Sequence, residues 1–376
     1  MKVALVSYFY PNVIFGGSAF YASNLADALS KYAEVTVIVP NVNPEILKAL
    51  NSQARHEKVR FLKLPFLRSP SFLLLASLRS SRKNFDIVHS NGGDGALCRF
   101  VSVETFHHMP DEFSGKIHSL PSRIALRRAA HIIAVSQKSR LELLNMGISE
   151  DKITIVENGV DIDKFCFQPY NAQELKRSLG LPDCKLVLNI NTELSRRKNL
   201  PLMLKSLQYL KEAYPGVKLV LIGPVAGRES VMQTFQKENL EKDLLYVSAV
   251  PPSLMPQYYR AADFLAMPSF KEGFGFPLLE SIAVGTPFVS MDVGIAPILS
   301  RQCFGRIASS EEDFIKECIG ILNNPLEFGD RGSTLVQEQF SWDACARKTM
   351  AVYEKARAPK GTGQAGDSKN SQEKDL

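Results

Sequence analysis

Short apolar, β-branched segments alternate with segments of helical periodicity along this 376-residue chain, and this alternation constrains the fold more than any other feature. Such segments are typical of strands buried on both faces of a parallel sheet, because the helices of βαβ units cover both faces. The alternation predicts a doubly wound α/β fold. The expected strands are residues 3–7, 35–39, 59–62, 87–89, 101–105, 132–135, 186–190, 218–222, 244–247, 264–267 and 288–290.

The alternation stops in a polar, turn-rich stretch at residues 158–171 and then begins again. A chain of this length is expected to form two domains, at roughly 100–200 residues per domain. We therefore divide it into an N-terminal domain, 1–168, and a C-terminal domain, 169–357. The remaining tail, 358–376, has almost no apolar residues and is predicted to be disordered, because it cannot bury enough surface to become ordered.

The cysteines and the N-terminus bear on the compartment of the protein. The six cysteines are scattered without a Cys-x-x-Cys pair, which favours reduced thiols in a cytoplasmic protein. The apolar N-terminus lacks a positive leader and a cleavage site, so we interpret it as a strand. No stretch reaches the roughly 18–20 apolar residues of a membrane span. Any membrane contact is therefore expected at the surface, on the inner face.

The net charge of +6 is concentrated in the first half, where residues 1–166 hold 20 Lys and Arg against 15 Asp and Glu. This bias favours an anionic acceptor or membrane surface over nucleic acid, for which no motif is present. Residues 66–83 and 120–128 combine apolar side chains with arginines. They fit a helix at a membrane surface, and equally a core helix with a solvated end.

The segment PSFKEGFGFPLLESIAVGTP, residues 268–287, is the most specific motif. It follows an expected strand and contains a Gly-Phe-Gly-Phe-Pro turn that opens a helix. Gly273 and Gly275 allow backbone amides to approach a ligand closely, and Pro277 suits the first helical turn. Because a helix N-terminus favours anions, this loop predicts a site for a diphosphate.

Two carboxylates, Glu272 and Glu280, stand on either side of that turn. A carboxylate repels phosphate but accepts two strong hydrogen bonds from a vicinal diol. We therefore expect the pair to face sugar and ribose hydroxyl groups. The alternative is that both are ordinary solvated helix charges.

A basic turn, Arg196, Arg197 and Lys198, follows the expected strand 186–190. Cations in series at this position indicate an anionic ligand, and such donors also stabilise the charge that develops on a departing diphosphate. An exposed basic turn without a ligand is the alternative.

Three further features lie in the N-terminal half. Gly16 and Gly17 separate the first strand from the first helix, where a bare backbone can approach a ligand, although no G-x-G-x-x-G fingerprint is present. His107 and His108 follow a strand at the sheet edge where doubly wound folds bind ligands; a surface pair is the alternative. His89 is interpreted as structural.

Asp161-Ile162-Asp163 has the Asp-x-Asp form that holds a divalent metal in a different transferase fold. It follows an Asn-Gly turn, so we interpret it as turn chemistry and predict no metal site.

The 268–287 segment resembles the signature of the retaining glycosyltransferase family 4, and residues 129–165 and the Phe-Ser-Trp at 340–342 also resemble that family. The similarity runs from residue 1 to about residue 355. It implies the GT-B fold, in which two Rossmann-like domains with doubly wound parallel sheets face each other across a cleft. It also implies that the C-terminal helix returns to the N-terminal domain.

The resemblance implies roles for the motif residues. Glu272 is expected beside the donor sugar, the amides of Gly273 and Phe274 at the diphosphate with Gly275 in the same loop, and Glu280 at the ribose. Some family members place an adjacent Arg-Lys at the diphosphate, which implies that role for Arg197 and Lys198.

In the N-terminal domain the resemblance places His107 near the donor sugar, and it places Gly16 and Gly17 along the cleft. His107, Arg197, Lys198 and Glu272 are thus the implied catalytic residues. A departure lies at Thr192-Glu193-Leu194, where family members often carry Gly-Arg-Leu.

The implied activity is retaining, metal-independent transfer of a hexose, of the mannose or glucose type, from a UDP- or GDP-sugar. The acceptor hydroxyl belongs to a glycan, a lipid-linked molecule or a small molecule. No cofactor besides this co-substrate is expected. A GT-B sugar-nucleotide epimerase and a degenerate sugar-nucleotide-binding protein are the alternative interpretations, and Glu193 favours the second.

Overall fold

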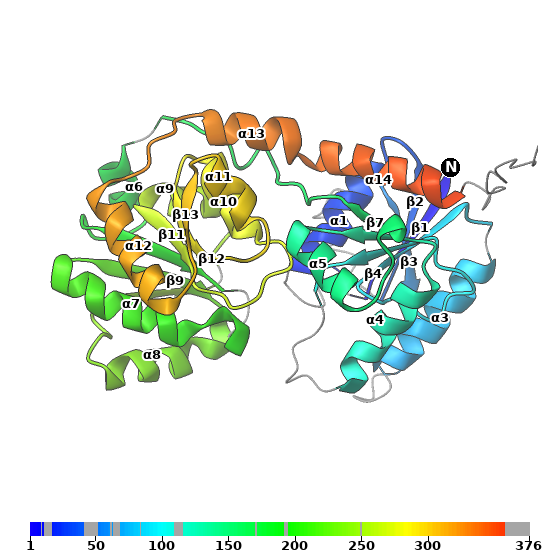
Figure 1. Ribbon diagram of the computed structural model, residues 1–376, viewed down its shortest axis with the longest axis horizontal. Helices are drawn as coiled ribbons and strands as arrows, with labels where there is room; N and C mark the ends of the chain where they lie inside the picture. The colour runs from blue at the N-terminus through cyan, green and yellow to red at the C-terminus, as the bar shows by residue number, and fades with distance from the viewer. Residues whose placement is uncertain are drawn as a thin grey trace, which may run out of the picture.

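The computed structural model describes residues 1–8, 10, 17–40, 52–60, 62, 68–82, 84–108, 116–169, 171–191, 195–248 and 250–357. Figure 1 shows two lobes, each built around one sheet with helices on both of its faces. The tail 358–376, predicted to be disordered, lies outside the described residues. Within the described residues, no helix is both long enough and apolar enough to cross a membrane.

The N-terminal sheet is entirely parallel, with the strand order β3-β2-β1-β4-β5-β6-β7. Its central strands are buried along almost their whole length, as expected for a sheet covered on both faces. The strands are β1 (Lys2–Val6), β2 (Glu34–Pro40), β3 (Arg55–Val59), β4 (Ile87–Asn91), β5 (Val103–Phe106), β6 (His131–Ala134) and β7 (Ile153–Ile155).

Alternate side chains of β1 enter two separate cores. Val3 and Leu5 pack with α1 on one face, whereas Ala4 and Val6 pack with α3 on the other. This follows from the two-residue period of a strand, which sends successive side chains to opposite faces. The described helices of this part are α1 (Gly17–Leu29), α3 (Arg68–Arg82), α4 (Lys116–Arg128) and α5 (Gln137–Asn145).

The C-terminal sheet is also parallel, with the order β10-β9-β8-β11-β12-β13. Its strands are β8 (Leu186–Ile190), β9 (Lys218–Gly223), β10 (Leu244–Ser248), β11 (Phe264–Met267), β12 (Phe288–Met291) and β13 (Gly305–Ala308). Its helices are α6 (Ala172–Ser178), α7 (Leu200–Ala213), α8 (Arg228–Lys237), α9 (Met255–Ala261), α10 (Phe276–Ala283), α11 (Ala296–Arg301), α12 (Glu311–Asn323) and α13 (Arg331–Gln339).

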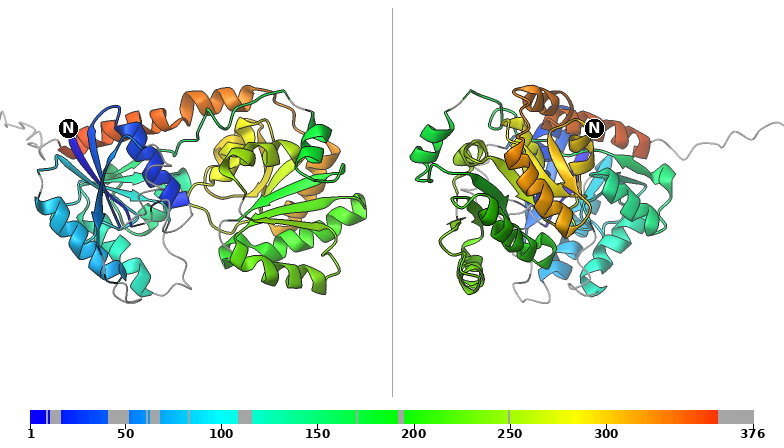
Figure 2. Two further views of the ribbon diagram at one scale, coloured as in Figure 1. Left: turned by 180° about the vertical axis from the view of Figure 1, so that it is seen from behind. Right: turned by 60° about the vertical axis from the view of Figure 1, so that its left-hand side comes forward.

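The last helix, α14 (Trp342–Arg357), packs on the N-terminal domain beside α1, as both figures show and as the resemblance implied (Figures 1 and 2). Tyr353 of this helix is fully buried in the core that contains β1 and α1. The returning chain runs beside the outgoing one, because Val160 forms a parallel bridge with Ser341 and its amide donates to Phe340 O. Two adjacent segments therefore connect the domains.

The predicted architecture of two doubly wound parallel sheets is confirmed. The division predicted at 168/169 falls in the connection between Ile155 and Leu186, the end of the first sheet and the start of the second. The strand predicted at 59–62 is wrong, since β3 spans Arg55–Val59, and β7 and β13 were not predicted. All three are edge strands, which are less buried than central ones and lack a continuous apolar run.

Candidate functional site

The loop after β11 has the conformation that its glycines and proline predict. Gly275 has a φ of 95°, a left-handed value that favours glycine, and it stands immediately before α10. Pro277 lies in the first turn of that helix, where its missing N–H costs no hydrogen bond. The helix N-terminus, with its positive dipole end, therefore opens at the carboxyl end of β11.

Glu272 in this loop is the centre of a buried charge cluster. One carboxylate oxygen lies 2.7 Å from Lys198 Nζ, and the other lies 3.0 Å from Arg197 Nη1. The three side chains are only 10%, 11% and 15% exposed, respectively. Burial alone would raise the pKa of Glu272, but Lys198 and Arg197 outweigh burial and lower the pKa below its usual 4.5. Glu272 is thus ionised and ion-paired at neutral pH.

The two cations reach this position through a turn of 3₁₀ helix, Arg196–Lys198, that precedes α7. Asn199 follows in a left-handed conformation and caps α7 through its side chain, which accepts from Leu202 N. The amide of Phe270 donates to Arg197 O at 2.8 Å, so the basic turn is joined through its backbone to the loop after β11, residues 268–275, which we call the donor loop. The sequence predicted an anionic ligand for this turn, but it did not reveal that Glu272 would itself pair with the cations.

Glu280, the second motif carboxylate, lies on α10 and bonds outside this cluster. Tyr259 of α9 donates its hydroxyl to Glu280 Oε2 at 2.6 Å. Burial raises the pKa of Glu280, although the bond from Tyr259 and the charge of Lys164 reduce the rise. The two carboxylates therefore differ in chemistry: Glu272 is held as an anion, and Glu280 has a greater tendency to carry a proton.

His107 follows β5, at the end of the strand where it was predicted. Its Nε2 lies 2.8 Å from Asn91 Oδ1, while the Asn91 amide donates to Ser7 Oγ and Ser18 O. Because Asn91 uses both its donors elsewhere, the His107 ring must donate from Nε2, which leaves Nδ1 as an acceptor in the neutral ring. Burial lowers the pKa of His107 to about 3, so the ring is neutral at pH 7.

Two glycines bring the domains close together. A Cβ built on Gly273 would lie 2.5 Å from His107 O, so the donor loop approaches the end of β5 at a distance that excludes a side chain. A Cβ built on Gly17, at the start of α1, would lie 3.3 Å from the Phe276 ring. Gly17 and His107 of the N-terminal domain therefore lie against Phe276 and Gly273 of the C-terminal domain, respectively.

Some predicted features fall outside this geometry. Gly16 and the Thr192-Glu193-Leu194 departure lie outside the described residues. Phe274 remains within the loop, between Gly273 and Gly275, where its side chain is buried and its carbonyl accepts from Ile295 N at 2.8 Å. The Asp161 side chain accepts from Lys164 N, which is the turn chemistry expected of it.

Sequence reasoning missed three sets of partners: Tyr259, Asn91, and the serines at 136 and 139. Each acts through one hydrogen bond or two to a predicted residue. The two serines lie within the 129–165 segment that resembles the family, but no site role was predicted for them. Asn91 directly follows His89-Ser90 at the end of β4, so its position at the carboxyl edge of the sheet was the one available signal.

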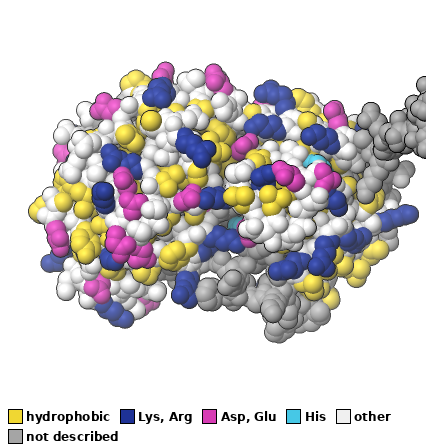
Figure 3. Space-filling model, in the orientation of Figure 1, with side chains coloured by type: hydrophobic (Ala, Val, Ile, Leu, Met, Phe, Trp, Pro, Cys, Tyr) yellow, Lys and Arg dark blue, Asp and Glu magenta, His cyan; other side chains and the backbone are white. Residues whose placement is uncertain are grey.

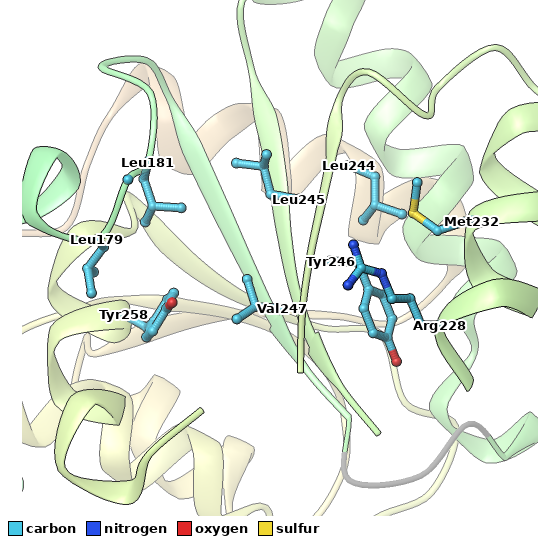
Figure 4. Close-up of a pocket in the computed structure, with 10 residues that line it drawn as sticks. Leu179, Leu181, Arg228, Met232, Leu244, Leu245, Tyr246, Val247 and Tyr258 are labelled. Atoms are coloured by element: carbon cyan, nitrogen blue, oxygen red, sulfur yellow. The ribbon is translucent and has the colours of Figure 1, made fainter. Parts of the chain in front are cut away.

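A separate cavity of about 290 Å³ lies along the open edge of the second sheet, at β10. Figure 4 shows Leu245 and Val247 on the same side of the strand as Tyr258, and Tyr246 on the side of Arg228. None of the predicted site residues lines it. We therefore take the Glu272 cluster, and not this cavity, as the candidate active site.

Comparison with known families matches both halves of the chain. Residues 15–164 match the model described as Glycosyltransferase Family 4, and residues 171–328 match the one described as Glycosyl transferases group 1. Together these matches include every described site residue.

Individual relatives of the chain are also named as glycosyltransferases. A D-inositol 3-phosphate glycosyltransferase of Segniliparus rotundus is 30% identical over 54% of this chain and 47% of its own length. An uncharacterized glycosyltransferase of Methanocaldococcus jannaschii is 23% identical over 94% of this chain and 98% of its own. The chain thus spans about half the length of the first relative and nearly all of the second.

Solved structures share the fold. Sucrose-phosphate synthase from Thermosynechococcus elongatus superposes with a TM-score of 0.78 at 19% identity, covering 94% of this chain and 98% of that one. Anabaena HepE in complex with UDP and glucose gives 0.76 at 18% identity, covering 94% and 100%.

Proposed function

This chain belongs to the family 4 type of glycosyltransferases with the GT-B fold, and on that premise we propose that it is a retaining, metal-independent hexosyltransferase. The donor is a UDP- or GDP-linked sugar of the glucose or mannose type. The acceptor is a hydroxyl group of a glycan, a lipid-linked molecule or a small molecule. The observation that carries this proposal is the Glu272 cluster at the N-terminus of α10, with two largely buried cations beside a helix dipole.

Arg197 and Lys198 supply the charge that a departing nucleoside diphosphate requires. In a partly buried site each charge-assisted hydrogen bond contributes about 1.5–3 kcal/mol. Both bonds strengthen as negative charge develops on the leaving group, so they favour the transition state over the bound donor. Two cations and the amides of the Gly273–Gly275 loop can fill the role that a divalent metal has in other transferases.

The carboxylates and His107 then recognise hydroxyl groups. Glu280 accepts from the ribose, next to its bond from Tyr259. Glu272 exchanges part of its ion pairing for the donor sugar, and His107 offers a neutral acceptor nitrogen from the other domain. Burial lowers the pKa of His107 to about 3, so its ring is neutral at pH 7 and can accept a hydrogen bond from a sugar hydroxyl.

The test is a thermal-shift and turnover screen of the purified protein against UDP- and GDP-sugars in the presence of EDTA. We expect one donor to raise the melting temperature and to release nucleotide, and Glu280→Ala to abolish both effects. Glu317→Gln is the control, because Glu317 pairs with Arg306 in the same domain, outside the site. A shift without release of nucleotide would favour the degenerate sugar-nucleotide-binding protein, and no shift with any nucleotide-sugar would refute the proposed donor site.

A lipid-linked acceptor is favoured by a basic-apolar patch on the N-terminal domain. We define the patch by its exposed residues Leu74, Leu78, Arg79, Leu97, Arg99, Phe100, Arg123 and Arg127. Figure 3 shows Lys and Arg side chains gathered with hydrophobic ones over α3 and α4. Neither helix contains an acidic residue, so the patch complements an anionic lipid surface.

Hydrogen bonds join the segments of this patch. Ser77 of α3 donates to Leu97 O at 2.5 Å. Arg128 of α4 donates to the carbonyls of Ala96, Cys98 and Arg99. The apolar residues of the loop are thus held between the two helices.

Sedimentation with phosphatidylglycerol vesicles and with phosphatidylcholine vesicles tests this surface. Near an anionic surface each arginine contributes about 1 kcal/mol, so Arg123→Gln with Arg127→Gln should weaken binding roughly thirtyfold. Lys205→Gln on the other domain is the control. Equal binding to both vesicle types, or none to either, would exclude an anionic lipid partner.

A further inference from the structure

One carbonyl of the donor loop is bound by hydroxyl groups of the other domain. Gly273 O accepts from Ser136 Oγ at 2.7 Å and from Ser139 Oγ at 3.1 Å. Both serines are buried at the N-terminus of α5, where Ser136 also caps the helix by accepting from Ser139 N. The hydroxyls are therefore held in place by the helix that carries them.

Ser139 also contacts His107, which belongs to the N-terminal domain. Its Oγ lies 2.8 Å from His107 O, so one hydroxyl lies within hydrogen-bond reach of both His107 and Gly273. A hydroxyl has one hydrogen to donate, and Ser139 therefore shares it between the two carbonyls. The absence of a side chain at Gly273 makes this approach possible, because a Cβ there would lie 2.5 Å from His107 O.

Ion pairs lie on either side of this contact. Lys271 Nζ lies 2.7 Å from Glu142 Oε1, and Lys138 Nζ lies 2.6 Å from Asp292 Oδ2. Each pair joins α5 to a loop of the C-terminal domain. Their side chains are 25–51% exposed, so each pair alone adds little stability, and the buried serine contact is the specific element.

We propose that Ser139 is a positioning residue for sugar transfer, which sets the distance between the His107 side and the Glu272 side of the site. The inference rests on the proposed function. Glu272 precedes Gly273 in the chain, so a displaced Gly273 backbone would move Glu272 relative to His107. Arg197, Lys198 and Glu280, which are proposed to hold the nucleotide, all lie in the C-terminal domain, so we expect them to bind it without the hydroxyl of Ser139.

Steady-state kinetics and nucleotide-binding measurements on Ser139→Ala separate an effect on sugar transfer from an effect on nucleotide binding. Removal of one shared hydrogen bond should lower kcat about tenfold, while the Kd for nucleoside diphosphate stays within about twofold. Gly273→Ala should lower both kcat and the affinity for nucleoside diphosphate, because its Cβ collides with His107 O and its amide belongs to the loop proposed to bind the diphosphate. Ser206→Ala is the matched control, since Ser206 is equally buried and bonds within α7.

Small-angle scattering adds a readout that does not depend on activity. Both Ser139→Ala and Gly273→Ala should increase the radius of gyration, because the domains separate, and Ser206→Ala should not. A wild-type kcat in Ser139→Ala, or an equal loss of nucleotide affinity, would overturn the proposal. If the wild type transfers no sugar, the proposed function fails, and an unchanged radius of gyration in both variants would then refute the positioning role as well.

Discussion

Replacing Glu272 by Gln should destabilise the protein and yet strengthen its binding of free nucleoside diphosphate. The carboxylate is 10% exposed and is bonded to Lys198 at 2.7 Å and to Arg197 at 3.0 Å. An amide can accept from one cation only, and its NH₂ group would face the other. Leaving a buried charge without its partner costs about 3–5 kcal/mol. At roughly 2–4 °C per kcal/mol for a domain of this size, the melting temperature should fall by about 6–20 °C.

The same change frees two cations for the diphosphate. In the wild type an incoming diphosphate must compete with Glu272, and each charge-assisted bond that it displaces is worth about 1.5–3 kcal/mol. Nucleoside diphosphate should therefore bind Glu272→Gln roughly 10- to 100-fold more tightly, while transfer falls because the donor sugar loses its carboxylate partner.

Isothermal titration with UDP and GDP, together with thermal melts, measures both effects. Glu317→Gln controls for the loss of a carboxylate elsewhere in the domain: it should leave nucleotide affinity unchanged and lower the melting temperature by only a few degrees. Weaker binding of nucleoside diphosphate to Glu272→Gln would refute the competition argument. An unchanged melting temperature would refute the assignment of a stabilising buried cluster.

Three further outcomes follow from single residues. Burial lowers the pKa of His107 to about 3, so its neutral ring stabilises the protein above pH 6.5, and this contribution is lost as the pH falls toward 3. His107→Gln should therefore flatten the pH dependence of the free energy of unfolding in urea, between pH 6 and 4, by about 1.4 kcal/mol per pH unit. Gly275→Ala, at a φ of 95°, should cost about 1–2 kcal/mol in urea unfolding, and an unaffected midpoint would contradict the strain argument. Tyr353→Phe should cost about 1–3 kcal/mol, because it leaves His89 Nδ1 buried without its partner at 2.7 Å; a loss below 0.5 kcal/mol in the same assay would mean that water replaces the hydroxyl.

Burial explains how far the fold could be predicted from the sequence. Central strands such as β8 and β11 are buried on both faces, so they appear as apolar runs and were predicted within a residue or two. The edge strand β3 reads Arg-His-Glu-Lys-Val, and its half-exposed residues carry no such pattern. Its place in the sheet is set by pairing with β2, which is a tertiary contact and leaves no periodicity in the chain.

In the candidate site too, local features could be predicted from the sequence and long-range contacts could not. The donor loop and the basic turn were identified because their chemistry is local: glycines, a proline and successive cations within a few residues. Their pairing was not predicted, because Arg197 and Glu272 are 75 residues apart and meet only when β8 and β11 lie side by side. The contact between Ser139 and Gly273 spans 134 residues and two domains, so no local pattern encodes it.

The groups proposed to bind the nucleotide-sugar lie in one domain, whereas the contacts proposed to support sugar transfer join the two domains. The proposed diphosphate and ribose groups lie in one domain and depend on the β8–β11 neighbourhood. The contacts between His107, Ser139 and Gly273 exist only when both domains meet. We therefore propose that the C-terminal domain binds the donor, and that the contacts at Ser139 hold the donor sugar beside His107. Loss of the Ser139 hydroxyl should then lower transfer without lowering nucleotide affinity, whereas changes at Arg197 or Lys198 should lower both.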